Sequence, residues 1–400
     1  MKKFYRRLLW AAFYIASLTL VAIVTSYIST NFLGIGPTPV RSAFAGRLPG
    51  VIEGNGPERR FQFFYATNRV NNEETFKGYG NELSEEITTG TFDTIISPYT
   101  PITPFVWFDS TQISWADRQV IPHDTFQKKL KDAVQASPQK SLLVIVWGFR
   151  DWFQSAALKT AYQAYALDIN TPVLLFDWPG NMGEGPRGYA ASQISATQSA
   201  PALAQILESV TKETGAEHVW LMGSSLGCQT ICEALKWAAK QPNTILNEHK
   251  LSEVVLSAPD VSADAFNDIF AESVQKTTHH LTAYVTSNDR ALLMSHWING
   301  ERRLGRTAEI TIPPENRKGQ YEFEEAYELL ELQAKGVKIF SIVDATPINK
   351  LRNLHHFFTD SPVFFDDLYQ RLLQPDNIVS RRLHQVNTTE NSRYWILWND

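Results

Sequence analysis

The residues Gly223-Ser224-Ser225-Leu226-Gly227 form a G-x-S-x-G pattern. This pattern directly follows a strand-like run, His218 to Met222, and opens a stretch with helical character. In a strand-to-helix turn of this kind the glycines let the backbone bend sharply, and the bend exposes the serine hydroxyl at the carboxyl edge of a sheet. Ser225 is therefore the candidate nucleophile of an acyl-transfer reaction. The alternative is a glycine-rich turn in which Ser225 only caps the helix.

A serine hydroxyl needs a general base, and an acid must orient that base. In this arrangement the acid and the histidine follow the serine in chain order, from loops after later strands. Asp289 comes directly after the expected strand Leu281 to Thr286, so it is the preferred acid. Two alternatives stay open. Asp289 could only cap the next helix, and Asp260, after the preceding strand, could reach the same imidazole.

Two adjacent histidines, His355 and His356, are the candidate bases. They follow the expected strand Val337 to Val343, which we take to be the last strand of the sheet. The remaining histidines fit this position less well; they are His123, His218, His249, His279, His280, His296 and His384. The order of residues alone does not choose between His355 and His356.

The tetrahedral intermediate of acyl transfer needs two backbone N–H groups aimed at its oxyanion. One comes from the residue after the nucleophile, here Leu226, and the other from the turn after the strand that opens the domain. The turn Gly148-Phe149-Arg150 follows the expected strand Leu142 to Trp147, and we expect the Phe149 N–H to be the second donor. A triad and two backbone donors complete this chemistry, so no cofactor is implied.

From about residue 141, short apolar and β-branched runs alternate with longer helical patterns, as a parallel sheet with crossover helices requires. The expected strands are Leu142 to Trp147, Pro172 to Phe176, His218 to Met222, Val254 to Ser257, Leu281 to Thr286 and Val337 to Val343. The expected helices lie near Ala156 to Asp168, Ala190 to Glu213, Leu226 to Lys240, Ala263 to Glu272, Glu322 to Ala334 and Val363 to Leu373. The predicted fold class is α/β, with a mostly parallel, doubly wound sheet and helices on both faces.

The 400 residues suffice for one large domain with additions. We divide the chain into a basic segment and membrane span (1–28), a Gly- and Pro-rich linker (29–58), a strand and loop extension (59–140) and a catalytic core (141–400). Within the extension, Phe61 to Tyr65 is predicted to be a strand that ends at Ala66-Thr67-Asn68. Residues 70 to 125 are predicted to form short strands and loops.

The amino terminus has the pattern of an uncleaved signal anchor. The apolar run Leu8 to Ile28 is long enough to cross a hydrocarbon core, and four basic residues precede it. The small-residue cleavage motif Ala43-Phe44-Ala45 lies far beyond the run, which favours an anchor over a cleaved signal peptide. The positive-inside rule then leaves the short amino terminus in the cytoplasm and the catalytic core on the extracytoplasmic, periplasmic side.

Three features of the sequence argue against a nucleic-acid-binding protein, a phosphate loop, and a metal site or disulfide. The formal net charge of −5 gives no electrostatic reason to expect nucleic-acid binding. Gly180 to Gly185 lacks the G-K-[ST] ending of a phosphate loop, so we interpret it as a flexible loop near the site. Cys228 and Cys232, four apart in an expected helix, are predicted to be small buried residues rather than a metal site or disulfide.

Short motifs occur in a fixed order from about residue 60 to the end of the chain. They are Phe64-Tyr65-Ala66-Thr67-Asn68-Arg69, Trp147-Gly148-Phe149, Phe176-Asp177-Trp178-Pro179, the serine turn, Ser257-Ala258-Pro259-Asp260, Asp289-Arg290-Ala291-Leu292, and His355-His356-Phe357-Phe358 followed by Ser361-Pro362-Val363. In this order the chain resembles the bacterial α/β-hydrolase family DUF900. The resemblance implies an α/β-hydrolase fold with a Ser, Asp and His triad, and it aligns the serine with Ser225 and the histidine with His355 rather than His356. The chain departs from the family at Trp147, where a His usually precedes the Gly.

Together these observations predict a membrane-anchored serine hydrolase that acts on small-molecule or lipid esters. Ser225 would attack, His355 would shuttle the proton and Asp289 would orient the imidazole. The rival hypothesis is a non-catalytic α/β-hydrolase scaffold that serves as a binding or assembly module. Its support is Trp147 and the N-terminal extension.

Overall fold

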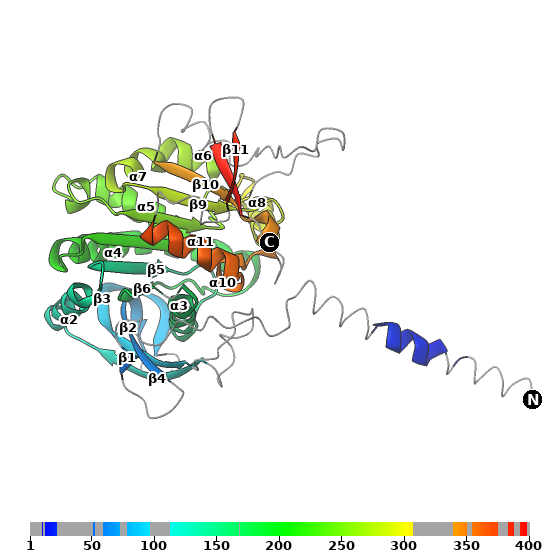
Figure 1. Ribbon diagram of the computed structural model, residues 1–400, viewed down its shortest axis with the longest axis horizontal. Coiled ribbons are helices and arrows are strands. Elements are labelled where there is room, and N and C mark those ends of the chain that lie inside the picture. The colour runs from blue at the N-terminus through cyan, green and yellow to red at the C-terminus, as the bar shows by residue number, and fades with distance from the viewer. Residues whose placement is uncertain are drawn as a thin grey trace, which may run out of the picture.

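The computed structural model describes residues 10, 13–21, 51–52, 59–72, 78–96, 113–167, 169–306, 339–349, 354–374, 383–387 and 393–397. These ranges contain one sheet with helices on both of its faces (Figure 1). The strands are β1 (Val51–Ile52), β2 (Arg59–Asn71), β3 (Tyr79–Ile96), β4 (Ile113–Val120), β5 (Ser141–Val146), β6 (Val173–Asp177), β7 (His218–Ser224), β8 (Glu253–Ser257), β9 (Leu281–Val285), β10 (Phe340–Asp344), β11 (Leu383–Asn387) and β12 (Arg393–Leu397). The helices are α2 (His123–Ala136), α3 (Phe153–Leu167), α4 (Gly185–Glu213), α5 (Gly227–Ala239), α6 (Ala263–Ala265), α7 (Ala271–Thr277), α8 (Arg290–Asn299), α10 (Phe357–Asp360) and α11 (Pro362–Leu373), with short turns η2 (Ile245–Asn247), η3 (Phe266–Phe270) and η5 (Thr346–Ile348).

The strand order places the parallel part of the sheet at its centre. The order is β11-β12-β10-β9-β8-β7-β5-β6-β2-β3-β4, and β1 pairs with β2 outside this path. All neighbours from β12 to β2 are parallel, whereas β3, β4, β11 and β1 pair antiparallel with their partners. The carboxyl ends of the parallel strands therefore meet at one edge of the sheet, where loops can gather side chains for chemistry.

Strand β5 shows why the central strands appear in the sequence as continuous apolar runs. All six of its residues are buried. Leu142, Val144 and Val146 pack into the cluster formed with α2, α4, α5 and α7, while Leu143 and Ile145 pack into the cluster formed with α3 and α11. Successive side chains of a strand point to opposite faces, so a strand covered by helices on both sides needs apolar residues throughout. The predicted α/β fold with helices on both faces is confirmed.

The cysteines lie in α5 and belong to the core. Cys228 and Cys232 are both free thiols and both buried. Burial raises the pKa of each thiol, because the thiolate would lose its hydration. Both side chains therefore pack as small apolar groups.

The N-terminal extension is more regular than the sequence predicts. β2 does not end at Ala66-Thr67-Asn68 but continues to Asn71, because residues Phe64 to Thr67 pair with β6 and the whole strand pairs with β3. The region expected to hold short strands and loops contains the 18-residue strand β3, together with β4 and the start of α2. These strands extend the central sheet, since β2 pairs with β6 in parallel.

The carboxyl-terminal side of the sheet also differs from the prediction. β10 is not the last strand, because β12 pairs with it in parallel and β11 pairs with β12. The helix expected at Glu322 to Ala334 lies outside the described residues. Residues 340–343 of the expected strand Val337 to Val343 form the start of β10.

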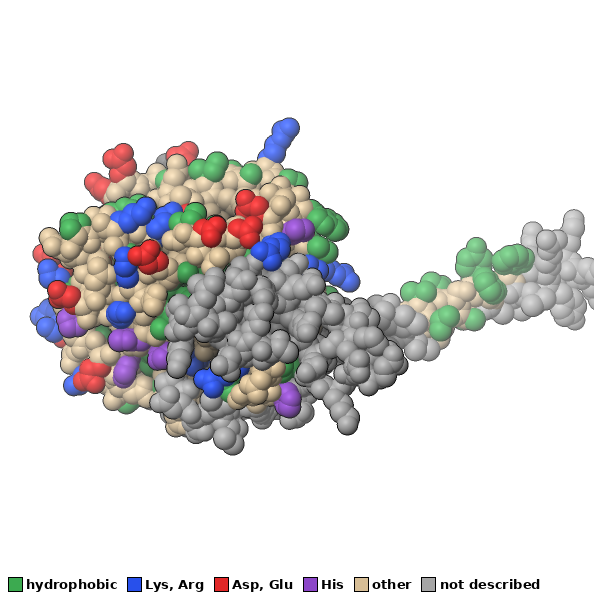
Figure 2. Space-filling view, turned by 90° about the horizontal axis from the view of Figure 1, so that it is seen from above, with side chains coloured by type: hydrophobic (Ala, Val, Ile, Leu, Met, Phe, Trp, Pro, Cys, Tyr) green, Lys and Arg blue, Asp and Glu red, His purple; other side chains and the backbone are tan. Residues whose placement is uncertain are grey.

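The predicted membrane span lies mostly outside the described residues. Within Leu8 to Ile28 the structure describes Trp10 and residues 13–21, which are helical. None of the helices in the described ranges is long and apolar enough to cross a bilayer. Figure 2 shows the hydrophobic side chains of the described helical residues, and it shows basic and acidic side chains interspersed on the visible face of the globular body.

Candidate active site

Ser225 occupies the sharp turn between β7 and α5. Its backbone has φ 51°, in the left-handed region that residues with a side chain rarely adopt. The turn is held from both sides, because the Ser225 N–H donates to the Ser257 carbonyl at 2.9 Å and the Ser225 carbonyl accepts from the Cys228 N–H at 3.0 Å. Strain that the surrounding structure maintains in this way is a common property of functional positions.

Close packing surrounds both glycines of the turn, and it is most restrictive at Gly227. A side chain at Gly223 would place its Cβ 2.5 Å from Ile231 Cδ1. One at Gly227 would lie 2.5 Å from the Trp147 carbonyl oxygen, which is backbone and has little freedom to move. The spacing of the G-x-S-x-G pattern thus has a steric cause on both sides of Ser225.

Asp289 and His355 form a buried pair at the same edge of the sheet. Asp289 Oδ2 lies 2.6 Å from His355 Nδ1, while Asp289 Oδ1 accepts the Leu292 N–H at 2.8 Å. Burial disfavours the charged imidazole, but the charge and hydrogen bond of Asp289 outweigh it and raise the pKa of His355 above its ordinary value. Asp289 therefore caps α8 and pairs with the histidine at once.

Asp260, the alternative acid, is engaged elsewhere. Its Oδ1 pairs with Arg303 Nε at 2.7 Å and accepts from Ser295 Oγ at 2.6 Å. Its Oδ2 accepts from the Tyr189 hydroxyl at 2.7 Å. Asp260 lines the same pocket as His355, but its carboxylate is committed to this network. The structure pairs the imidazole with Asp289.

The neighbouring histidine, His356, sits just before α10. Its ring lies 5.5 Å from the ring of His355 and 5.9 Å from that of Phe358, measured between centroids. Both histidines line the pocket, yet it is His355 that bonds to Asp289.

The turn Gly148-Phe149-Arg150 lies against the serine turn. A Cβ built on Gly148 would be 2.9 Å from Ser225 Cβ and 3.3 Å from the Leu226 nitrogen, so only a glycine permits this approach. The N–H groups of Phe149 and Leu226 have no hydrogen-bond acceptor among the described residues. Two free donors beside a serine hydroxyl are what an oxyanion hole requires.

Trp147 does not enter the site. Its indole is buried, and its Nε1 donates to Thr160 Oγ1 of α3 at 2.8 Å. The Trp147 side chain packs in the core cluster under the turn. The departure from the family pattern at this position therefore leaves the space beside Ser225 open, and it no longer supports a scaffold without activity.

A pocket of about 720 Å³ connects these groups. It is lined by Ser225, Phe149 and His355, by residues of α8, and by residues that follow β5. Gly185, the end of the glycine-rich loop, also lines it. Among the described residues, no cluster of three or more His, Cys, Asp or Glu side chains is arranged to hold a metal ion.

Comparison with protein-family models decides the family. Residues 122–365, more than half of the chain, match the model described as α/β-hydrolase of unknown function (DUF900). The chain belongs to the DUF900 family. This confirms the predicted family, although the match covers a shorter span than residues 60 to 400. No curated protein matches this DUF900 chain significantly.

Solved structures resemble the DUF900 chain only distantly. The rice cell wall degrading esterase LipA from Xanthomonas oryzae is 16% identical, with a TM-score of 0.24 over 53% of this chain and 45% of LipA. An inhibited esterase B from Lactobacillus rhamnosis is 12% identical, with a TM-score of 0.23 over 53% of this chain and 68% of the esterase. A protein designated FAE is 11% identical, with a TM-score of 0.31 over 84% of this chain and 95% of that protein. The DUF900 chain thus spans less than half of LipA, and likeness at this level carries no argument about substrate.

Several residues around the candidate active site were not predicted from the sequence. Tyr189 and Arg303 bind Asp260, and neither stands in a motif. Arg69 enters the sequence analysis only as part of a family motif, yet it is completely buried and bonded to Asp177, the second residue of another motif. The presence of an arginine and an aspartate in two of the family motifs was the available signal for this pair.

Proposed function

We propose that this chain is a serine hydrolase that cleaves carboxylic esters. The observation that carries the proposal is the 2.6 Å contact between Asp289 Oδ2 and His355 Nδ1, in a pocket that the strained Ser225 also lines. An imidazole fixed through Nδ1 presents Nε2 as a base, and a serine in a left-handed turn presents its hydroxyl. The family membership agrees with this chemistry.

In the proposed reaction Ser225 Oγ attacks the ester carbonyl while His355 Nε2 accepts its proton. The oxyanion of the tetrahedral intermediate accepts hydrogen bonds from the Phe149 and Leu226 N–H groups. The intermediate collapses when the imidazolium gives its proton to the alkoxy oxygen, so the alcohol leaves and an acyl-serine remains. Water then attacks the acyl-serine while His355 Nε2 accepts its proton. The imidazolium returns this proton to Ser225 Oγ as the acyl–oxygen bond breaks, so the acid leaves and the serine is regenerated.

The side chains of α8 that line the pocket favour a substrate with an apolar acyl group. Leu292, Met294 and Ile298 line the pocket from this helix. Met294 and Ile298 keep 49% and 39% of their surface exposed, so an acyl chain lying against them would bury apolar area on both sides. Such burial contributes about 25 cal/mol per Å². Carboxylic esters of small molecules or lipids are therefore the proposed substrate class.

A serine-reactive fluorophosphonate probe tests the proposal together with a panel of activated esters. The wild-type chain should be labelled and should hydrolyse the esters, and Ser225→Ala should abolish both. Ser224→Ala, at the adjacent position, should keep the label. Matched anilides and thioesters in the same panel test the preference for esters. An unlabelled wild-type chain, or a Ser225→Ala variant with half of the wild-type rate, would rule out the assignment.

We also propose that the protein is anchored in a membrane with its catalytic domain on the extracytoplasmic side. The apolar run Leu8 to Ile28 and the four basic residues before it support this. Phe13, Leu18 and Val21, in the described helical residues of the run, are each more than 60% exposed. Exposed apolar side chains of this kind are stabilised when lipid covers them.

A further inference from the structure

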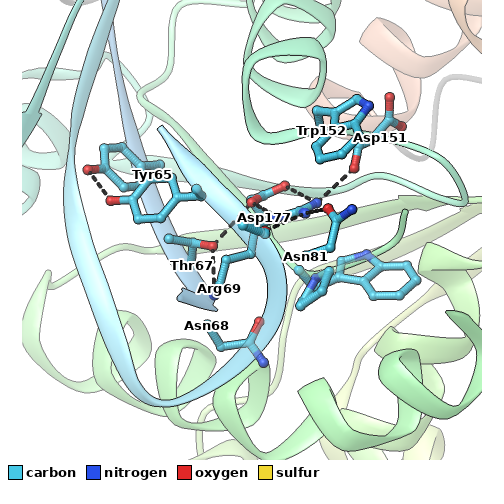
Figure 3. Close-up of polar contacts among 12 residues, drawn as sticks. Tyr65, Thr67, Asn68, Arg69, Asn81, Asp151, Trp152 and Asp177 are labelled. Atoms are coloured by element: carbon cyan, nitrogen blue, oxygen red, sulfur yellow. Dashed lines mark hydrogen bonds and ion pairs between the residues drawn. The ribbon is translucent and has the colours of Figure 1, made fainter. Parts of the chain in front are cut away.

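Arg69 is a fully buried charged side chain at the carboxyl edge of the sheet, and the proposed reaction does not use it. Each of its five N–H donors has an acceptor (Figure 3). Nε bonds to Asp177 Oδ2 at 2.6 Å, and Nη2 bonds to Asp177 Oδ1 at 3.2 Å and to the Asp151 carbonyl at 2.8 Å. Nη1 bonds to the Gly80 carbonyl at 3.2 Å and to Asn81 Oδ1 at 3.1 Å.

Asp177, the partner of Arg69, is also held by several hydrogen bonds. Asp177 ends β6 and also accepts from Thr67 Oγ1 at 3.1 Å. Thr67 and Asp177 are directly opposite in the parallel pairing of β2 with β6. Taking a charged pair out of water costs free energy unless its geometry is good and its remaining donors and acceptors are satisfied. The pair therefore has one defined position, fixed by two strands.

The bond from Arg69 to the Asp151 carbonyl connects this pair to the candidate oxyanion turn. Asp151 lies two residues after Phe149. Two further bonds hold the same turn: the Trp178 Nε1 donates to the Trp147 carbonyl at 2.8 Å, and the Arg150 N–H donates to the Gly180 carbonyl at 2.8 Å. Trp178 and Gly180 lie one and three residues after Asp177, in the loop after β6.

We infer that the Arg69–Asp177 pair positions the oxyanion turn, which makes Arg69 a positioning residue for the reaction. This inference rests on the proposed function. Arg69 binds the Asp151 carbonyl at the end of the turn. Asp177 fixes the start of the loop after β6, and this loop binds the Trp147 carbonyl and the Arg150 N–H. The turn is therefore held at both ends. Among the described residues the Phe149 N–H between them has no acceptor, so it is available to the substrate. An oxyanion donor stabilises the transition state only when it lies within a few tenths of an ångström of its place.

A second buried pair provides a matched control at the opposite edge of the sheet. Arg371 Nε bonds to Glu253 Oε2 at 2.9 Å, and Thr282 Oγ1 bonds to Glu253 Oε1 at 2.7 Å. Glu253 is the first residue of β8, so this pair lies at the amino ends of the strands. It repeats the combination of arginine, carboxylate and threonine without touching the oxyanion turn.

Arg69→Lys and Arg371→Lys form the central comparison. A lysine keeps the buried charge but cannot reproduce the fork that reaches two acceptors. We expect Arg69→Lys to lower kcat for an activated ester about tenfold or more, with KM changed less than about twofold, because the turn acts in the transition state. Its affinity for a boronic acid, which forms a tetrahedral adduct with the serine, should fall by a similar factor. Arg371→Lys should leave kcat and boronate affinity within about twofold of wild type, even where its Tm falls equally.

Hydrogen exchange supplies a measurement that does not depend on turnover. Backbone amides of residues 147–152 should exchange faster in Arg69→Lys than in wild type, and Arg371→Lys should leave them unchanged. Equal effects of the two lysine variants on kcat, or unchanged exchange in residues 147–152, would overturn the inference. A wild-type chain with no probe labelling and no ester hydrolysis would instead refute the proposed function, while the exchange data would still report on the clamp.

If Arg69→Lys does not fold, two milder variants test whether the Arg69–Asp177 pair positions the oxyanion turn. Thr67→Val removes the hydrogen bond to Asp177 and also the acceptor of the Arg69 backbone N–H. Thr282→Val removes the equivalent bond to Glu253. We expect Thr67→Val to lower kcat about threefold or more and to speed exchange in residues 147–152, with Thr282→Val matching wild type in both. Matching behaviour of the two valine variants would contradict the inference.

Discussion

Asp289 binds His355 through one carboxylate oxygen and caps helix α8 through the other. Oδ2 lies 2.6 Å from His355 Nδ1, and Oδ1 accepts the Leu292 N–H at 2.8 Å. The helix cap fixes the rotation of the carboxylate, and the carboxylate in turn fixes the ring of the histidine. Helix capping and pairing with the histidine, which the sequence presented as alternatives, are thus two uses of one side chain.

Asp289→Asn should separate these two uses. Asparagine is as good a cap as aspartate, so α8 should remain intact. The amide cannot stabilise the imidazolium, and we expect kcat to fall by about 10⁴-fold. Asp260→Asn is the comparison: it leaves Arg303 buried without its counter-charge, so Tm should fall markedly while kcat falls much less. Steady-state kinetics and thermal unfolding of both variants measure this, and a reversed ranking of kcat would assign the acid role to Asp260.

His355→Ala and His356→Ala distinguish the two adjacent histidines. Loss of the base should reduce kcat by several orders of magnitude, whereas His356→Ala should cost less than about tenfold. Both residues line the pocket, so changes in KM are expected for either variant. Probe-labelling rates provide a second measure, and faster labelling of His355→Ala than of His356→Ala would transfer the role.

The pH dependence of kcat/KM should reflect the raised pKa of His355. The base must be neutral to accept a proton, so activity should rise with pH, with a midpoint above the ordinary histidine value of 6.5. Burial alone would lower this pKa, and the Asp289 charge raises it. The residual activity of Asp289→Asn should therefore have its midpoint at lower pH than wild type. A midpoint that stays the same or moves upward would show that Asp289 does not set the pKa.

The central strands and the order of the candidate site residues could be predicted because their causes are local. β5 to β9 are buried on both faces, so they appear as apolar runs, and glycine at position 227 is demanded by backbone atoms within 3 Å. The apolar spacing of α2 is also present in the sequence, at Phe126, Leu130 and Val134, although residues 59–140 are assigned from the sequence to a strand and loop extension, with no helix predicted there.

Other features depend on partners that are distant in the chain. β3 is half exposed along much of its length and is a strand because it pairs with β2 and β4. Asp260 is bound by Arg303, 43 residues away, and Tyr189, 71 residues away. No local sequence pattern predicts such contacts, so the choice between Asp260 and Asp289 required the three-dimensional structure.

The apolar wall of α8 should set the preference for acyl chain length. Met294→Asp and Ile298→Asp place a charge where the acyl chain is proposed to lie. We expect kcat/KM for a long-chain ester to fall at least tenfold, and that for an acetate ester to change less than about threefold, since each buried methylene contributes about 0.8 kcal/mol. Met182→Asp, at a half-exposed methionine that does not line the pocket, is the control. Equal losses for short and long esters would place the acyl chain elsewhere.

The apolar amino terminus should hold the protein in a membrane. Leu8 to Ile28 is long enough to span, and the basic residues before it favour a cytoplasmic amino terminus. We expect the full chain to sediment with membranes and to resist extraction by high salt and by alkaline carbonate, because lipid covers its apolar side chains. A chain that starts near Gly56 should be soluble and retain ester hydrolysis, since every proposed catalytic group lies beyond that residue. A carboxyl-terminal tag should be digested by protease added from the outer face. Recovery of a soluble mature protein that begins near Gly46 would show a cleaved signal peptide, and a tag that stays protected in sealed, outer-face-exposed cells would contradict the orientation.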